Sequence, residues 1–204
     1  MERLLLFDFD GVVVDSLKLY KESINFCLKT IGEPAIKNHT DFLALFEKNF
    51  YDGIRKKGVD VAEFTRVSAA VAPTLNYDHV SPFYDLEPVL EKLKNNNIMV
   101  IISSNSAYAI NLMLSKYKFD HFFRNVLGCE FMFSKSEKII HAMNELNFEN
   151  GSTYYIGDTA GDIKEAKEAN VKTVAVTWGW HSGEKLISTE PDYIIDTPEE
   201  LLKI

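Results

Sequence analysis

Two aspartates near the N-terminus form the pattern most suggestive of chemistry in this 204-residue chain. Asp8 and Asp10 flank Phe9 directly after a short apolar run, and alternation along an extended chain puts both carboxylates on the same side. One carboxylate can attack phosphorus to form an acyl phosphate, while the other protonates the leaving oxygen and later activates water. The next residue, Gly11, lets the chain turn away and leaves room for a substrate phosphate. We therefore predict Asp8 as a nucleophile and Asp10 as an acid/base group; a capping turn is the alternative.

A second pair of aspartates follows a later apolar run. Asp158 and Asp162 are four residues apart where a helix is predicted to begin, and this spacing puts both carboxylates on one helix face. Oxygen ligands gathered without Cys or His favour Mg²⁺ over zinc or copper. Helix capping by the same acids is the alternative. The metal site that we predict has as ligands Asp8, Asp10 and Asp158, supported by Asp162.

Groups that could hold a phosphate occur between these two acidic pairs. Ser103, Ser104 and Asn105 follow an apolar run at 98–102, just before a predicted helix. Hydroxyls and free N–H groups at a helix N-terminus bind phosphate readily, although plain helix capping would also explain these residue types. We predict that all three residues bind the phosphate, with either Ser103 or Ser104 as its main ligand.

A lysine is also needed, both to screen the acids and to hold a phosphate. Lys135 and Lys138 lie upstream of the second acidic pair, at the start of a helix predicted around residues 139–146. We favour Lys135 because it directly follows a small residue at the end of the preceding segment. Lys138 is expected one turn into the helix and facing away. Either lysine alone could also be a solvated surface residue.

The elements that must position these residues alternate between strand and helix. Short apolar runs typical of buried parallel strands occur at residues 4–7, 98–102, 153–156 and 173–176. Segments of helical periodicity lie between the last three runs. This alternation predicts an α/β fold with a doubly wound parallel sheet, in which ligands bind at the carboxyl ends of the strands.

A purely helical segment interrupts this alternation after the first strand. Its first helix is predicted to end at Gly32 and Pro34, and Asp60 is predicted to cap a later helix. The aromatic residues of this segment, such as Phe46, are interpreted as the core of a small domain. We therefore predict two domains: an α/β core of residues 1–15 and 81–204, and an inserted helical cap of residues 16–80.

Composition excludes several function classes. Hydrophobic residues make up 46% and charged residues 25% of the chain, as in ordinary globular proteins. The net charge of −8 argues against a protein that binds nucleic acid by neutralising phosphates. No apolar run is long enough for a membrane span or a signal peptide, and Cys27 and Cys129 form no disulfide framework. We expect a cytoplasmic protein that binds a small phosphate ester, with neither nucleic acid nor membrane as a partner.

In their order along the chain, these segments resemble the four motifs of the haloacid dehalogenase superfamily. The residues that carry the resemblance are Asp8-x-Asp10-Gly11, Ser103 with Ser104 and Asn105, Lys135 or Lys138, and Gly157-Asp158 with Asp162. The helical insertion after the first motif is similar to the small cap of the family. The resemblance spans nearly the whole chain and implies a Rossmann-like core.

The resemblance also implies an activity. Members of this kind are Mg²⁺-dependent phosphatases that cleave small phosphorylated metabolites through an aspartyl phosphate, here on Asp8. The family's Mg²⁺ would be held by Asp8, the Asp10 carbonyl and Asp158. Because dehalogenating members lack the second aspartate, Asp10 points to phosphoryl transfer.

The C-terminal third narrows the resemblance to one branch of the superfamily. The runs 174–180 and 191–193 look like the phosphoglycolate phosphatase branch, but the lysine of the third motif is not followed by proline as it usually is there. Two alternatives stay open. A sugar-phosphate mutase of the same superfamily would return the phosphate to a substrate hydroxyl, and a non-catalytic regulatory module would retain only the fold.

Overall fold

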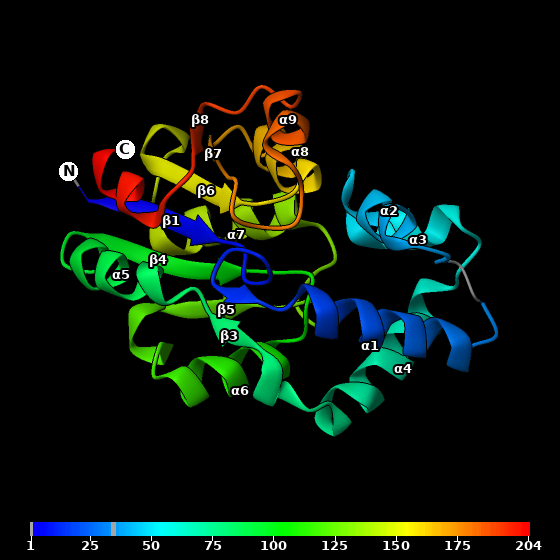
Figure 1. Ribbon diagram of the computed structural model, residues 1–204. Coiled ribbons are helices and arrows are strands. Elements are labelled where there is room, and N and C mark those ends of the chain that lie inside the picture. Colours follow the sequence, from blue (N-terminus) through cyan, green and yellow to red (C-terminus); the bar gives the residue numbers. More distant parts are fainter. Residues whose placement is uncertain (1, 34–35) are drawn as a thin grey trace.

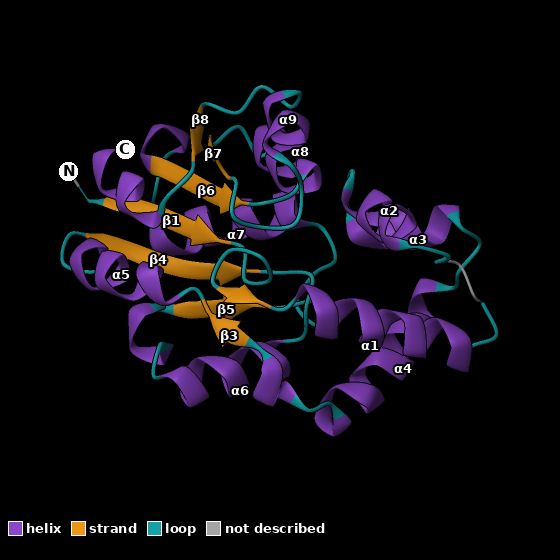
Figure 2. Ribbon diagram, viewed as in Figure 1, coloured by secondary structure: helices purple, strands orange, loops and turns teal. Residues whose placement is uncertain are grey.

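Six parallel strands form the central sheet of the structure, a computed structural model that describes residues 2–33 and 36–204. The strand order is β5-β4-β1-β6-β7-β8, and every neighbouring pair is parallel. The first strand of the chain thus lies inside the sheet, as in a doubly wound fold (Figure 2). The strands are β1 (Arg3–Phe7), β4 (Asn97–Ile102), β5 (Asn125–Leu127), β6 (Thr153–Gly157), β7 (Lys172–Val176) and β8 (Tyr193–Ile195).

The two faces of this sheet carry separate hydrophobic cores, because successive side chains of a strand point to opposite faces. Leu5 and Phe7 of β1 pack on the side covered by the helices α5 and α6, whereas Leu4 and Leu6 pack on the side covered by α7 and α8. All four side chains are buried. The first strand is therefore covered on both faces, as its continuous apolar run predicts.

The helices of the core lie between these strands in sequence. They are α5 (Glu87–Leu93), α6 (Ala107–Tyr117), α7 (Lys135–Leu146), α8 (Ala160–Glu168) and α9 (Gly183–Ile187). The prediction of an α/β sheet is confirmed, but α7 begins four residues earlier than the predicted start at residue 139. Short 3-10 helices occur at Ala44–Phe46, Ala72–Thr74, Tyr77–His79, Tyr84–Leu86, Asp120–Phe122, Asn150–Ser152 and Pro198–Lys203.

The inserted segment is helical and has a hydrophobic core of its own. Its helices are α1 (Leu17–Thr30), α2 (His39–Leu43), α3 (Phe50–Lys56) and α4 (Val61–Val71). Asp60 caps α4, since its carboxylate accepts hydrogen bonds from the N–H groups of Ala62 and Glu63. The α1 helix ends before Gly32, and Pro34 lies outside the described residues. Phe42, Phe46 and Phe50 are buried together in this core, as expected.

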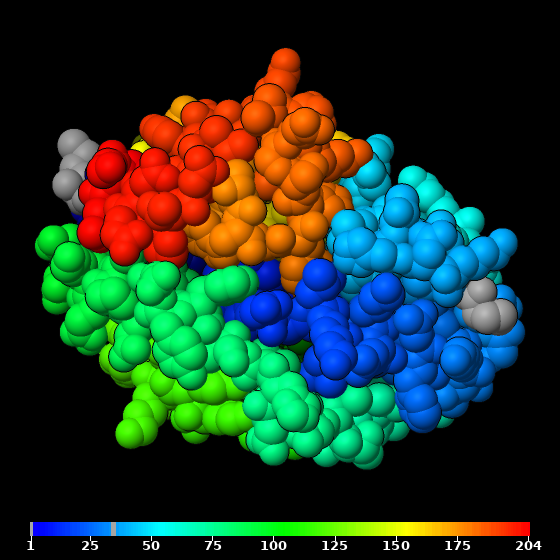
Figure 3. Space-filling view, viewed as in Figure 1, coloured from blue at the N-terminus to red at the C-terminus, as the bar shows by residue number. Residues whose placement is uncertain are grey.

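A two-stranded ribbon joins the inserted helices to the sheet. Its strands are β2 (Val14–Asp15) and β3 (Ser81–Pro82), which pair antiparallel. The helices α1 to α4 lie beyond the carboxyl ends of β1, β4 and β6 (Figure 1). In the space-filling view the inserted segment rests directly on the orange loop that follows β7 (Figure 3), and Trp180 of that loop packs into its core. We call residues 16–80 the cap, and we propose that they form a separate domain hinged at this ribbon.

Two further sequence predictions concern membranes and cysteines. Within residues 2–33 and 36–204, no helix combines the length and the apolar character required to cross a bilayer. Cys27 and Cys129 are both free thiols, the first buried and the second half-buried.

Candidate active site

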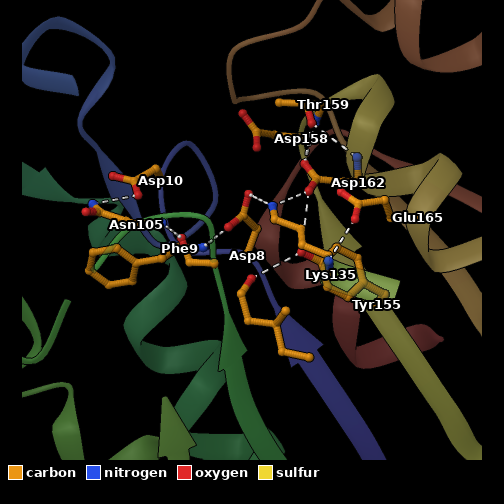
Figure 4. Close-up of polar contacts among 12 residues, drawn as sticks. Asp8, Phe9, Asp10, Asn105, Lys135, Tyr155, Asp158, Thr159, Asp162 and Glu165 are labelled. Carbon is orange, nitrogen blue, oxygen red and sulfur yellow. Dashed lines mark hydrogen bonds and ion pairs between the residues drawn. The ribbon is translucent and has the colours of Figure 1, made fainter. Parts of the chain in front are cut away.

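The site is built around Asp8, which follows β1 at the carboxyl edge of the sheet. Its carboxylate accepts hydrogen bonds from the Phe9 N–H at 2.7 Å and from the Lys135 ammonium at 2.8 Å. The same ammonium lies 2.5 Å from Asp162 Oδ1. Lys135 begins α7 and Asp162 lies in the first turn of α8, so two helix N-termini bring these groups to the end of β1 (Figure 4).

Three carboxylates gather around this single ammonium. One oxygen each from Asp8, Asp158 and Asp162 lies within 4.8 Å of the others, and all three side chains are buried. Burial raises the pKa of Asp8 to about 7, because the nearby Asp162 adds to this effect and the attraction of Lys135 offsets only part of it. Burial and the same acidic neighbours hold the pKa of Asp158 well above its usual range. Without a further cation, it is therefore costly for the three carboxyl groups to be ionised at the same time, because their negative charges repel one another.

Asp162 differs from the other two acids because both of its oxygens are occupied. One accepts from Lys135, and the other accepts from the N–H and the hydroxyl of Thr159 in a capping box. Although burial opposes it, these contacts lower the pKa of Asp162. Asp162 thus fixes Lys135 and the start of α8, which fits the supporting position predicted for it.

The surroundings of Asp158 show where a metal ion would fit. Its Oδ2 accepts a hydrogen bond from the backbone N–H of Trp180 at 2.7 Å, whereas its buried Oδ1 has no hydrogen-bond partner among the described residues. A buried carboxylate oxygen without a donor costs free energy that a cation would recover. The atoms that would bind a metal here are all carboxylate oxygens, which are ligands that suit Mg²⁺.

Two glycines make room for the Asp158 carboxylate. A Cβ atom at Gly11 or at Gly179 would overlap the Asp158 side chain, and Gly11 also has a φ of +83°. The Gly11 N–H donates to the Val14 carbonyl at 2.9 Å. The space beside Gly11 is therefore occupied by the carboxylate of Asp158, and its contact with a substrate phosphate stays a prediction.

Asp10 lines the same small cavity as Asp8, but its carboxylate is not part of the acidic cluster. The strand ends at Phe7, and in Figure 4 the Asp10 carboxylate lies beside Asn105, apart from Asp158 and Asp162. It accepts hydrogen bonds from the Ser16 hydroxyl at 2.6 Å and from the Asn105 amide at 3.0 Å. Burial raises its pKa, and these two hydrogen bonds only partly oppose the shift. Its side chain is therefore not one of the three clustered carboxylates, whereas its backbone carbonyl stays a candidate ligand.

The predicted phosphate-binding segment divides into two roles. Ser103 and Ser104 line a cavity of about 20 Å³ together with Asp8, Asp10 and Lys135. Asn105 does not line this cavity, and its amide holds Asp10 instead. The prediction that Asn105 contacts phosphate is not supported, because its nitrogen is committed to that carboxylate.

Lys138 is placed differently from the prediction. Because α7 begins at Lys135, Lys138 lies one turn in but faces the sheet; it is fully buried and does not face away. Its ammonium donates to the Ser103 carbonyl at 2.5 Å. Burial and the nearby Lys135 lower its pKa to about 8. Lys135 contacts the acidic cluster, whereas Lys138 supports the backbone of the neighbouring strand end.

Contacts between cap and core close the site. Tyr51 of α3 donates its hydroxyl proton to the Ser104 carbonyl at 2.9 Å. Asn49, which caps α3, donates to Glu165 at 3.0 Å, and the same Glu165 oxygen accepts the Lys135 N–H at 2.7 Å. The cap is thus tied directly to the segment of Ser103 and Ser104 and, through Glu165, to the start of α7 at Lys135.

Sequence reasoning missed the residues that link cap and core, including Glu165 and His181. Glu165 gives no signal because its spacing is that of an ordinary helix surface. His181 is buried, accepts the Ala160 N–H at 3.0 Å through Nδ1, and places Nε2 3.2 Å from the Leu43 carbonyl of the cap. It therefore joins the start of α8 to the cap and does not line the cavity at Asp8.

Comparisons with known proteins agree with this architecture. The family model of haloacid dehalogenase-like hydrolases matches residues 5–176. A phosphoglycolate phosphatase from Synechococcus elongatus is 25% identical over 98% of this chain and 95% of its own, and one from Aquifex aeolicus is 27% identical over 99% and 96%. Among solved structures, a hydrolase of the haloacid dehalogenase-like family from Streptococcus pneumoniae superposes with a TM-score of 0.80 at 21% identity, covering 99% of this chain and 97% of that one.

The charge imbalance generates a prediction about metal and pH. In EDTA, the protonated carboxyl groups favour the folded state, because their pKa is higher there than in the unfolded chain. This contribution to the free energy of unfolding is complete below the ordinary aspartate pKa. It is lost as the pH rises through about 7, the pKa of Asp8 in the fold. Millimolar Mg²⁺ should stabilise the protein by about 2.7 kcal/mol at one hundred times Kd, a Tm increase of roughly 5–10 °C. The increase should be larger at pH 8 than at pH 6, since protons compete with the metal.

Thermal melts with MgCl₂, NaCl or EDTA measure this effect. Asp158→Ala should lose most of the Mg²⁺ shift, whereas Asp120→Ala, which removes an exposed acid, should keep it. Equal shifts from MgCl₂ and from NaCl at matched ionic strength would show that the cluster does not bind the metal.

Proposed function

The chain belongs to the haloacid dehalogenase-like hydrolases, and from that premise we propose that it is a Mg²⁺-dependent phosphatase of small phosphorylated metabolites that forms an aspartyl phosphate on Asp8. The observation that carries the proposal is the position of the Asp8 carboxylate. It is held by Lys135 and the Phe9 N–H beside an Asp158 oxygen for which the described residues offer no hydrogen-bond donor. The two relatives named phosphoglycolate phosphatase support hydrolysis of a phosphate monoester.

We assign the first step to Asp8. Its Oδ2 is oriented by Lys135 and its Oδ1 by the backbone, so a phosphoryl group in the adjoining cavity meets a carboxylate of fixed direction. The Ser103 hydroxyl, which accepts the Asn105 N–H at 3.1 Å, keeps its own proton to donate to a phosphate oxygen. Lys135 supplies positive charge on the same side. These groups hold the phosphate while the ester bond to the leaving oxygen breaks.

We assign the proton transfers to Asp10. Its raised pKa favours a proton on the carboxyl group in the first step. That proton passes to the departing oxygen, and the resulting carboxylate then takes a proton from the water that hydrolyses the acyl phosphate. Ser16 and Asn105 keep the group aimed between cap and core. Asp10 can therefore serve as acid and then as base.

Asp8, Asp158 and the Asp10 carbonyl would hold Mg²⁺, with Asp162 acting through Lys135. Bound Mg²⁺ supplies neutralising charge for the phosphoryl oxygens. The cavity of about 20 Å³ at Asp8 admits roughly one or two waters. The cap must therefore open at the ribbon to admit a substrate and close to exclude bulk water.

Conservative substitutions test the two aspartates. Asp8→Asn should abolish turnover because the nucleophile is lost while the side-chain volume is kept. Asp10→Asn should lower kcat by roughly 10²–10⁴-fold, the usual contribution of an acid/base group. Phosphate release from acetyl phosphate in Mg²⁺ measures both effects, and Asp15→Asn, an exposed acid of the ribbon, serves as control. Phosphate release near the wild-type rate by a folded Asp8→Asn variant would remove Asp8 from its role.

The two lysines can be separated in the same assay. Lys135→Met should lower kcat by several powers of ten, because an ammonium that touches both Asp8 and the phosphate is removed. Lys138→Met removes only a donor to the Ser103 carbonyl, and we expect a loss below about tenfold. Circular dichroism checks the fold of both variants. A larger loss in Lys138→Met would reverse the assignment.

A further inference from the structure

A second cavity lies between the cap and the core, next to Asp10. Its volume is about 40 Å³, and we call it the chamber. Asp10, Tyr20 and Ser104 line both the chamber and the smaller cavity at Asp8. The two spaces therefore adjoin each other at the group that we assign to protonate the leaving oxygen. Because the phosphoryl group must face Asp8, the remainder of a substrate has to extend past Asp10 into the chamber.

The lining of the chamber is apolar and hydroxylic. Leu19, Phe64 and Leu75 contribute apolar surface, and Ser23 and Ser68 contribute hydroxyls from α1 and α4. Such a lining favours carbon atoms and uncharged groups that exchange hydrogen bonds with serine.

The chamber also lacks positive charge. Among the described residues, no lysine, arginine or histidine lines it, and its only ionisable carboxyl group is that of Asp10. Lys135 is already committed to Asp8 and Asp162, and Lys138 to the Ser103 carbonyl. A carboxylate or phosphate on the leaving group would lie beside an acid without a compensating cation, which is costly in a closed site.

We propose that the chamber selects phosphate monoesters of small uncharged alcohols and rejects those whose leaving group is an anion. This inference rests on the proposed phosphatase function and adds the class of substrate. It sets the chain apart from enzymes that must bind an anionic leaving group, because those need a cation. Among the described residues this chamber has none: besides Asp10, its lining is apolar or uncharged polar, including the amide of Asn105, which is committed to Asp10.

An isosteric pair of substrates tests the proposal. Phosphoglycolate and phosphoglycolamide have the same number of heavy atoms and differ in the charge of the leaving group. With wild-type protein in Mg²⁺, kcat/KM should be at least about tenfold higher for the amide, a modest value for an unpaired carboxylate next to an acid. An equal or higher kcat/KM for phosphoglycolate would overturn the proposal.

Substitutions that add one charge supply the second arm. Ser68→Lys places an ammonium in the chamber and should shift the ratio toward phosphoglycolate by at least about tenfold. Ala69→Lys adds the same charge on the exposed side of α4 and should leave the ratio unchanged. If Ser68→Lys does not fold, Ser23→Lys on α1 makes the same test. An unchanged ratio in a folded chamber variant would contradict the proposal.

Acetyl phosphate separates this inference from the proposed function. Asp8-dependent hydrolysis of acetyl phosphate with hydrolysis of neither glycolate-derived ester would overturn only the chamber proposal. If acetyl phosphate and both esters all resist the wild-type protein in Mg²⁺, the phosphatase function itself fails.

Discussion

The buried ammonium of Lys135 is the contact on which the rest of the site depends. It contacts two of the three clustered carboxylates, those of Asp8 and Asp162, and no other cation forms an ion pair with the cluster in the part of the chain described. Burial opposes its charge, but the two acids raise its pKa well above the usual range, so it stays protonated. One positive charge cannot balance three negative ones. This shortage of positive charge agrees with the raised pKa of Asp158 and with its Oδ1 atom, which has no hydrogen-bond partner among the described residues.

The position of the cap over the site also matters for these buried charges. A cluster of buried charges catalyses best where water is excluded, because electrostatic interactions are stronger there. Asn49 and Tyr51 of the cap bind Glu165 and the Ser104 carbonyl, which adjoin Lys135 and the phosphate-binding segment. The cap therefore covers the site and supplies part of the lining of the chamber. The ribbon of β2 and β3 joins the cap to the sheet, and we propose that it is the hinge of the cap.

Much of this site could be predicted because parallel strands bring their carboxyl ends together, so Asp8, Ser103 and Asp158 had to meet. Details that depend on tertiary contacts could not. Lys138 was expected to face away, but the helix start at Lys135 turns it into the sheet. Asp10 lines the cavity at Asp8 but stays outside the acidic cluster, because the strand ends at Phe7 and the turn directs its carboxylate to Ser16. The strands β5 and β8 have only three residues each, too few for a periodic signal.

The central claim is that the acidic cluster stays partly protonated until a divalent cation binds and balances the negative charge of its carboxylates. Isothermal titration calorimetry of the metal-free protein with MgCl₂ tests it, in buffers of different ionisation enthalpy at pH 6.5. We predict the release of about one proton per Mg²⁺ bound, because the metal displaces protons from ligands whose pKa is raised. The release should decline as the pH rises above 7, where Asp8 is already ionised. Mg²⁺ binding without proton release at pH 6.5 would contradict the account.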